Sequence, residues 1–247
     1  MRDAVVEGIS QERAALLAAL AHAGGDDWSR ETVCTGWSVK DVLAHTVEGE
    51  LNVGKVYRGE LRESGFIDPN DGIAKWAALP GEAVRAALWQ HGTATQRALE
   101  AMTEHTWRAP IKVFGCREIR HLARLHLFDL SVHGHDLTEA LGVSAVWTDR
   151  LAFLTEFVVR AAPSTLRRLK VSPAGALEVR CDGRSWVLDG RSGEWTLGQE
   201  PAGTSVSLEP EDLVLLTTGR RARGDVHAVI DGDPEPAERI LRAWRVV

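Results

Sequence analysis

Apolar positions recur three and four residues apart along the first two thirds of the chain, and this spacing predicts helices. Gly, Pro and Asp gather in the stretches between these segments, which is typical of loops. Several long helices joined by such loops predict a helical bundle. The helices are expected at residues 3–23, 39–60, 81–105, 117–141 and 149–162.

The pattern changes in the last third of the chain. The segment "ALEVRCDGRSWVLD" alternates around Asp182 and Gly183, a pair that predicts a β-hairpin. Further strands are expected in "GEWTLG", "TSVSLE" and "DVHAVID", and helices in "EPEDLVLLTTGRR" and "DPEPAERILRAW". We therefore predict an all-α domain over residues 1–162 and a small α+β domain over residues 168–247.

The segment "GWSVKDVLAH" predicts a helix with a well-defined start. Ser38 is a suitable N-cap, and Asp41 three positions later completes a capping-box motif. His45 lies in the second turn of this helix among apolar residues. An imidazole buried there without a partner would be costly, so its position needs an explanation.

The helix at 117–141 carries polar residues inside its apolar face. At about 100° per residue, one narrow stripe collects imidazoles and carboxylates that belong on the outside of an ordinary amphipathic helix. Arginines and other polar residues occupy the opposite face. The stripe consists of Leu122, His126, Asp129, His133, Asp136 and Ala140.

A metal site would explain these buried polar positions. Asp129 and His133 are four residues apart and therefore adjacent on consecutive turns, and His45 is the best candidate for a third ligand. Two imidazoles and one carboxylate suit Zn²⁺, and also Fe²⁺ or Mn²⁺. Two alternatives remain open, namely satisfied core histidines and a simple hydrogen bond between Asp129 and His133.

Composition excludes several classes of protein. The formal net charge is −6 and no long basic run occurs, so we expect no nucleic-acid partner. No run of 18 apolar residues occurs and the first residues lack a signal pattern, so we expect no membrane partner. The three cysteines are far apart and outside any CxxC motif, which predicts a reducing, cytoplasmic location.

The two polar motifs resemble those of the mycothiol-dependent maleylpyruvate isomerase family, which belongs to the DinB-like metalloenzyme superfamily. "GWSVKDVLAH" resembles the family's first metal-ligand helix, and "DLSVHGHDL" resembles its Glu-x-x-x-His-Gly-x-Asp-Leu segment. The resemblance implies a DinB-like four-helix bundle followed by a small, sterol-carrier-like α+β domain. It also implies that His45, Asp129 and His133 hold a divalent metal, usually zinc.

Other residues gain expected roles from the same resemblance. "LLTTGRRARGDVHAVIDGD" resembles a C-terminal stretch whose arginine reaches the active site, with Arg220 the best match and Arg221 the next. These arginines would bind substrate or the thiol cofactor. His126 is a further candidate, as an extra ligand, as a partner of a ligand or as a base that contacts substrate. Asp129 departs from the family pattern, because glutamate is usual there.

The family resemblance implies a thiol enzyme. Metal coordination deprotonates a thiol, which can then transfer to a small electrophilic metabolite or assist its cis–trans isomerisation. The expected thiol is mycothiol, a low-molecular-weight thiol of actinobacteria, whose high-GC genomes suit a chain in which arginine supplies most basic residues. We expect a monomer or homodimer. The alternatives are a metal-dependent hydrolase that activates water, and a non-enzymatic ligand-binding or regulatory protein with a structural metal.

Overall fold

The computed structural model describes residues 2–64, 69–143, 147, 150–173 and 175–246. The chain divides into two compact units, Met1–Ala145 and Val146–Val247. The first is mostly helical, and the second contains a five-stranded sheet with helices. This order of a helical unit before an α+β unit agrees with the sequence prediction.

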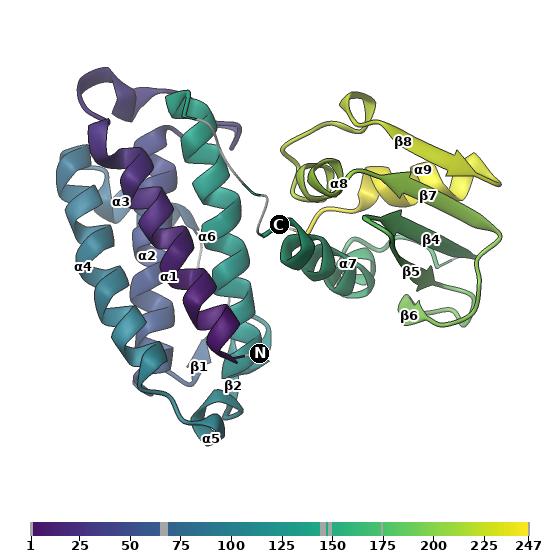
Figure 1. The fold of residues 1–247 in the computed structure, drawn as a ribbon, viewed down its shortest axis with the longest axis horizontal. Coiled ribbons are helices and arrows are strands. Elements are labelled where there is room, and N and C mark those ends of the chain that lie inside the picture. The colour runs from purple at the N-terminus through teal and green to yellow at the C-terminus, as the bar shows by residue number, and fades with distance from the viewer. Residues whose placement is uncertain (1, 65–68, 144–146, 148–149, 174, 247) are drawn as a thin grey trace. The chain divides into compact units, whose positions relative to one another are not determined.

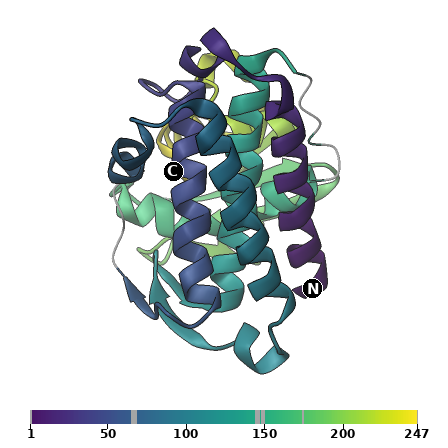
Figure 2. The same ribbon diagram turned by 90° about the vertical axis from the view of Figure 1, so that its left-hand side faces the viewer.

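Four long helices form the body of the N-terminal unit (Figures 1 and 2). Helix α1 packs against α4 and α6, and α2 packs against the same two helices, so the four helices close into a ring. Their bounds are α1 Arg2–Ala19, α2 Val39–Tyr57, α4 Gly81–Glu100 and α6 Ile119–Leu141. Each agrees with a predicted helix to within a few residues at its ends, except that the helix expected at 81–105 ends at Glu100.

The apolar faces of these helices form the core of the N-terminal unit. Val42 and Leu43 of α2, Leu88 of α4 and Leu137 of α6 are fully buried together. Each such side chain contributes roughly 1.5–3 kcal/mol relative to an exposed position. Among the described residues, no helix combines the length and the apolar character needed to cross a bilayer.

Short elements lie in the segments between the long helices or replace the ends of predicted helices, as η1 does within the helix expected at 3–23. A small sheet has the order β1-β2-β3, with β1 parallel and β3 antiparallel to β2. Strands and helices this short carry too few residues to show a hydrophobic period, so the sequence did not predict them. They are η1 Leu20–His22, η2 Gly25–Ser29, β1 Glu63–Ser64, α3 Pro69–Trp76, α5 Glu104–Trp107, β2 Pro110–Val113 and β3 Cys116–Glu118.

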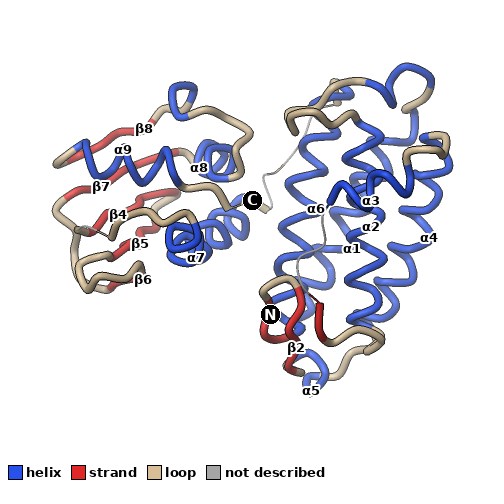
Figure 3. Tube along the Cα trace, turned by 180° about the vertical axis from the view of Figure 1, so that it is seen from behind, coloured by secondary structure: helices blue, strands red, loops and turns tan. Residues whose placement is uncertain are grey.

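The C-terminal unit is built on a sheet of order β6-β5-β4-β7-β8, in which only β4 and β7 are parallel (Figure 3). The predicted hairpin is present, because Asp182 and Gly183 join β4 to β5 with positive φ angles of 51° and 68°. The strands are β4 Ala176–Cys181, β5 Arg184–Asp189, β6 Thr196–Gly198, β7 Thr204–Leu208 and β8 Ala228–Asp231. The helical elements are α7 Leu151–Arg168, α8 Pro210–Thr217, η3 Arg223–Asp225 and α9 Pro234–Ala243.

The division between the units lies earlier than the expected boundary. The sequence pattern predicts a helix at 149–162 at the end of the N-terminal domain. In the structure, α7 continues through Pro163 to Arg168 and packs on α8, β5 and β6. Its apolar residues, including Leu154 and Val158, are buried within the C-terminal unit. A helical period shows that a segment forms a helix, but it does not show which core covers its apolar face.

The capping box at the start of α2 is formed as predicted. The Ser38 hydroxyl accepts a hydrogen bond from the Asp41 backbone N–H at 3.3 Å, and the Asp41 carboxylate accepts one from the Ser38 N–H at 2.9 Å. This reciprocal pair satisfies two backbone donors that a helix start otherwise leaves open. It also fixes where α2 begins, at Val39, six residues before His45.

We predict that Ser38→Ala lowers the free energy of unfolding by about 1 kcal/mol, because one backbone N–H loses its acceptor. Urea denaturation measures this loss. Ser38→Thr keeps a hydroxyl at the N-cap and should retain most of the stability. Equal stability of Ser38→Ala and the wild type would show that the cap contributes nothing.

Candidate functional site

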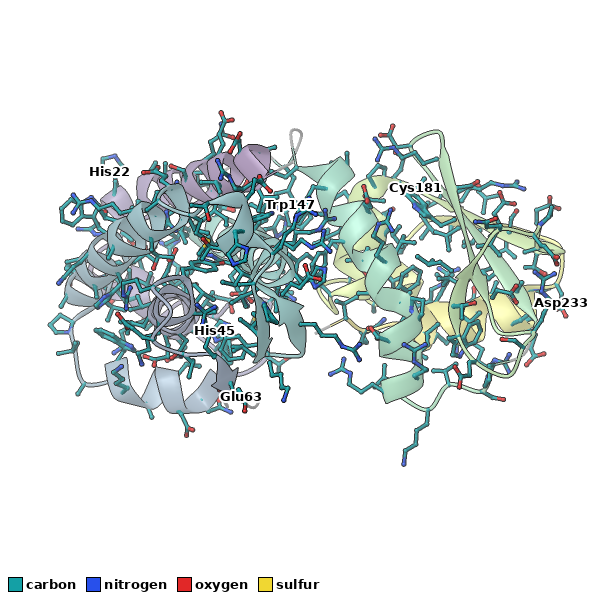
Figure 4. The ribbon with its side chains drawn as sticks, turned by 90° about the horizontal axis from the view of Figure 1, so that it is seen from below. His22, His45, Glu63, Trp147, Cys181 and Asp233 are labelled. Carbon is teal, nitrogen blue, oxygen red and sulfur yellow. The ribbon has the colours of Figure 1, made fainter. Side chains whose placement is uncertain are left out.

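Three of the predicted ligands converge between α2 and α6. His45 projects from α2, while Asp129 and His133 project from consecutive turns of α6, and the two helices pack directly against each other. Nε2 of His45 lies 3.8 Å from Oδ1 of Asp129, and Nε2 of His133 lies 3.7 Å from the same oxygen. Ligand atoms of the three side chains lie within 4.8 Å of one another. Figure 4 labels His45 among the side chains of the N-terminal unit.

The donor set fits a divalent metal. Two ligand atoms that each bind zinc at 2.0–2.1 Å in a tetrahedral site lie about 3.4 Å apart. This is close to the 3.8 and 3.7 Å that separate Oδ1 of Asp129 from Nε2 of His45 and of His133. A distance of 3.7 Å is too long for a hydrogen bond, so the simple intrahelical hydrogen bond between Asp129 and His133 is not formed. The side chains are 22%, 35% and 12% exposed for His45, Asp129 and His133, so the group is reachable from solvent.

The electrostatics of the cluster favour an ionised carboxylate. Burial by itself raises the pKa of Asp129, but the imidazoles of His45 and His133 on either side hold that pKa well below its usual range. Metal ligands must be deprotonated to bind. Asp129 is therefore in its ligand form at neutral pH.

Asp136 fixes the orientation of His133. Nδ1 of His133 donates to Oδ2 of Asp136 at 2.9 Å, which directs Nε2 of the same ring toward Asp129. Asp136 is completely buried, three residues after His133 on α6. Histidines that bind metals usually donate their second ring N–H to a carboxylate in this way, which fixes the tautomer.

The loop before α2 places an aromatic ring against both histidines. The Trp37 ring centroid lies 5.3 Å from that of His45 and 6.3 Å from that of His133. A tight turn holds this ring, because the Trp37 N–H donates to the Cys34 carbonyl at 2.9 Å and Gly36 adopts a φ of +81° that favours glycine. The loop thus holds the Trp37 ring where it restricts the orientations of both imidazoles.

His126, a further candidate, lies in a second cluster that is deeply buried. Its Nε2 is 3.4 Å from Oε1 of Glu50, and its Nδ1 is hydrogen-bonded to the Tyr57 hydroxyl at 3.3 Å. Arg13 of α1 donates to the same Glu50 oxygen at 2.6 Å. Within the described residues, His126 is not part of the three-residue ligand group. Its predicted role as ligand or base stays a prediction.

The buried cluster depends on charge pairing. Burial raises the pKa of Glu50, but His126 and Arg13 together lower it to about 2. The Arg13 side chain passes over Gly92 of α4, where a Cβ would lie 2.3 Å from Cδ of the arginine. Gly92 therefore provides the space through which a guanidinium reaches the centre of the unit.

Arg220 and Arg221 belong to the C-terminal unit, directly after α8. Arg220 donates to the Thr218 carbonyl at 2.8 Å, and Arg221 forms ion pairs with Asp212 and Glu211. These contacts show how each arginine is held within its own unit. The roles predicted for them at the substrate or the thiol stay predictions.

Sequence reasoning missed several residues of the site. Asp136 was visible on the polar stripe of α6, but the stripe alone does not show that its carboxylate pairs with His133. Cys34, whose Sγ lies 3.2 Å from Oδ2 of Asp136, is in a loop and has no periodic signal. Glu50 follows His45 by five positions, and only the packing of three helices shows that it faces His126 and Arg13.

Comparisons with known proteins identify the family and the fold of the chain. A family model described as "Mycothiol maleylpyruvate isomerase N-terminal domain" matches residues 9–138, more than half of the chain. A crystal structure of the mycothiol-dependent maleylpyruvate isomerase superimposes with a TM-score of 0.67 at 15% identity, over 94% of both chains. A point mutant of that enzyme gives 0.69 at 14% identity, over 92% of both. At these identities the likeness establishes the fold. No curated protein matches the sequence.

We predict that Glu50→Gln is less stable than the wild type at pH 7 by on the order of 3 kcal/mol, because it leaves Arg13 buried without its counter-charge. The folded pKa of Glu50, about 2, lies below its unfolded value of 4.5, so its contribution is full above pH 4.5 and is lost as pH falls toward 2. The stability gap between the two proteins should therefore close over that window.

Urea denaturation at a series of pH values between 2 and 7 measures this gap. Glu7→Gln, which changes an exposed glutamate of α1, is the matched control and should stay close to the wild type throughout. A constant difference between Glu50→Gln and the wild type across the window would contradict the charge-pairing explanation.

Proposed function

Because the chain belongs to the family of the mycothiol maleylpyruvate isomerase N-terminal domain, we propose that it is a metal-dependent enzyme that uses mycothiol. Its substrate is a small electrophilic metabolite, to which the thiol is transferred or whose cis–trans isomerisation the thiol assists. The observation that carries this proposal is the convergence of His45, Asp129 and His133 at a half-buried, reachable position.

His45, Asp129 and His133 would hold the metal, with zinc as the expected ion. When bound, a divalent metal lowers the pKa of a coordinated thiol so far that the proton is lost. The chain contributes the orientation of its own ligands. Asp136 holds the His133 ring through Nδ1, Trp37 lies against both imidazoles, and Asp129 is kept ionised by its neighbours.

The finer features of the family are part of the same proposal. The four packed helices of the N-terminal unit support a DinB-like bundle, and we propose a sterol-carrier-like domain for the C-terminal unit. A cytoplasmic location is proposed with them, because three cysteines far apart in the sequence are typical of proteins from a reducing compartment. Roles for His126, Arg220 and Arg221 and a monomeric or homodimeric state stay predictions.

The position of His126 favours a catalytic metal site over a purely structural one. A closed site needs four protein ligands, whereas catalytic sites keep a position for water or substrate. The sequence analysis named His126 as a possible extra ligand. In the structure, the His126 imidazole instead contacts Glu50 and Tyr57. This arrangement supports an open site. A hydrolase that activates water would use the same three ligands, so the requirement for a thiol is what distinguishes the two enzymes.

We predict about one divalent metal ion per chain, lost in His45→Ala, Asp129→Ala and His133→Ala. Each substitution removes one of three ligands, so the remaining pair should bind too weakly to survive purification. Elemental analysis of the purified proteins measures the metal content. Asp129→Glu restores the carboxylate that is usual in the family and should retain metal.

The control for the metal experiment is His22→Ala, which removes an exposed histidine outside the ligand group. It should contain as much metal as the wild type. Wild-type metal content in all three ligand variants would place the metal elsewhere in the chain.

We predict that turnover requires a low-molecular-weight thiol and that mycothiol supports it better than glutathione. Incubation of the metal-loaded protein with a panel of small electrophiles, with and without thiol, is followed by mass spectrometry of the products. A mass increase equal to the thiol indicates transfer. A product of unchanged mass that forms only with thiol indicates isomerisation.

The alternatives give different results in this experiment. A hydrolase would turn over equally fast without thiol, and its product would gain the mass of water. A ligand-binding or regulatory protein would bind the electrophile without turnover. Either result would replace the thiol-enzyme proposal.

A further inference from the structure

The thiol of Cys34 makes contact with the residue that orients the His133 ligand. Sγ of Cys34 lies 3.2 Å from Oδ2 of Asp136, within the range of a hydrogen bond to sulfur. The same oxygen accepts the Nδ1–H of His133 at 2.9 Å. One carboxylate oxygen therefore receives two donors, one from the loop before α2 and one from α6.

The buried position of Asp136 makes these donors important. A carboxylate with no exposure has lost its hydration and is held in place by the hydrogen bonds it accepts. Two donors that meet on Oδ2 restrict the rotation of the carboxyl group about its χ2 torsion. That rotation decides whether Oδ2 stays aligned with the His133 ring.

The loop itself holds Cys34 firmly. The Cys34 N–H donates to the Thr32 hydroxyl at 3.2 Å, and the Cys34 carbonyl accepts from the Trp37 N–H at 2.9 Å. Cys34 and Trp37 also pack against the apolar core of the helices. Because the loop is held in place, the Cys34 thiol stays at a fixed position beside the Asp136 carboxylate.

We propose that Cys34 is a positioning residue of the metal centre: its thiol fixes the Asp136 carboxylate, which in turn fixes the His133 ring with Nε2 toward Asp129. The inference rests on the metal site of the proposed function. It assigns to this half-buried cysteine a structural hydrogen bond within the centre rather than a reaction with substrate or thiol.

The affinity of the purified protein for Zn²⁺, measured by competition with a chromophoric chelator, tests the proposal. Asp136→Ala should weaken zinc binding about 10–100-fold, the usual effect of removing the partner of a ligating histidine. Cys34→Ala should weaken it about three- to tenfold, the effect of one lost hydrogen bond. Cys34→Ser keeps a donor and should restore most of the affinity.

The matched control is Cys116→Ala, which removes another half-buried cysteine that lies outside both possible ligand groups. It should bind zinc as the wild type does. Equal affinities of Cys34→Ala and the wild type would overturn the proposal, whereas failure of the wild type to bind zinc would overturn the metal site of the proposed function.

A double-mutant cycle tests whether Cys34 acts through Asp136. If it does, adding Cys34→Ala to Asp136→Ala should cause no further loss of zinc affinity. Additive losses would show that the cysteine acts independently of the carboxylate and would overturn the proposed chain of contacts.

Two spectroscopic readouts complete the test. Because Cys34, His133 and Asp136 could together bind a metal, Cd²⁺ titration is followed in the ultraviolet. A thiolate-to-cadmium absorption that disappears in Cys34→Ser would make Cys34 a ligand and overturn the positioning role.

In the metal-free protein, ¹⁵N NMR should show His133 protonated at Nδ1, with a mixture of tautomers in Asp136→Ala and a smaller change in Cys34→Ala. An unchanged spectrum in both variants would also overturn it.

Discussion

The contact between α2 and α6 is the constraint on which the N-terminal unit depends. At this interface, contacts between the two helices form at two levels. His45 of α2 lies beside Asp129 of α6, and Glu50 of α2 lies beside His126 of α6. At one level, the His45, Asp129 and His133 side chains are partly exposed and gather their ligand atoms within 4.8 Å of one another. At the other, Glu50 and His126 are almost completely buried and pair with Arg13 of a third helix. A shift of one helix along the other would break both groups together.

These two groups differ in what their burial costs and in what they can do. In the deep cluster, Glu50 is paired with Arg13 and His126 inside the protein, so removing one partner would leave an uncompensated buried charge. The outer cluster keeps its ligand atoms near solvent, and its geometry is held by groups behind it. Asp136 and Trp37 constrain the imidazoles, and Cys34 ties the loop before α2 to Asp136. In the proposed metal site, the placement of His45 and His133 therefore depends on neighbouring residues that contact them or their partners.

Membership of the mycothiol maleylpyruvate isomerase N-terminal domain family gives this geometry its chemical interpretation. The ligand group alone suits any reaction in which a divalent metal activates a small nucleophile. The family favours a thiol over water. Aspartate at position 129 in place of the usual glutamate shortens the ligand by one methylene, yet Oδ1 still lies within 3.8 Å of both imidazoles. The shorter side chain is thus compatible with the same three-residue arrangement.

The sequence by itself determined the long helices, the capping box at Ser38, the hairpin at Asp182 and Gly183, and the three candidate ligands. The helices, the cap and the hairpin follow from short-range rules, because a helical period, a cap or a turn involves neighbours along the chain. The candidate ligands came from the polar positions on two helices together with the family resemblance. The tertiary structure decided which core covers α7, that Cys34 reaches Asp136, and that His126 faces Glu50 rather than the ligand group. These contacts join residues far apart in sequence, and their geometry is set by how helices and loops pack, which no local pattern records.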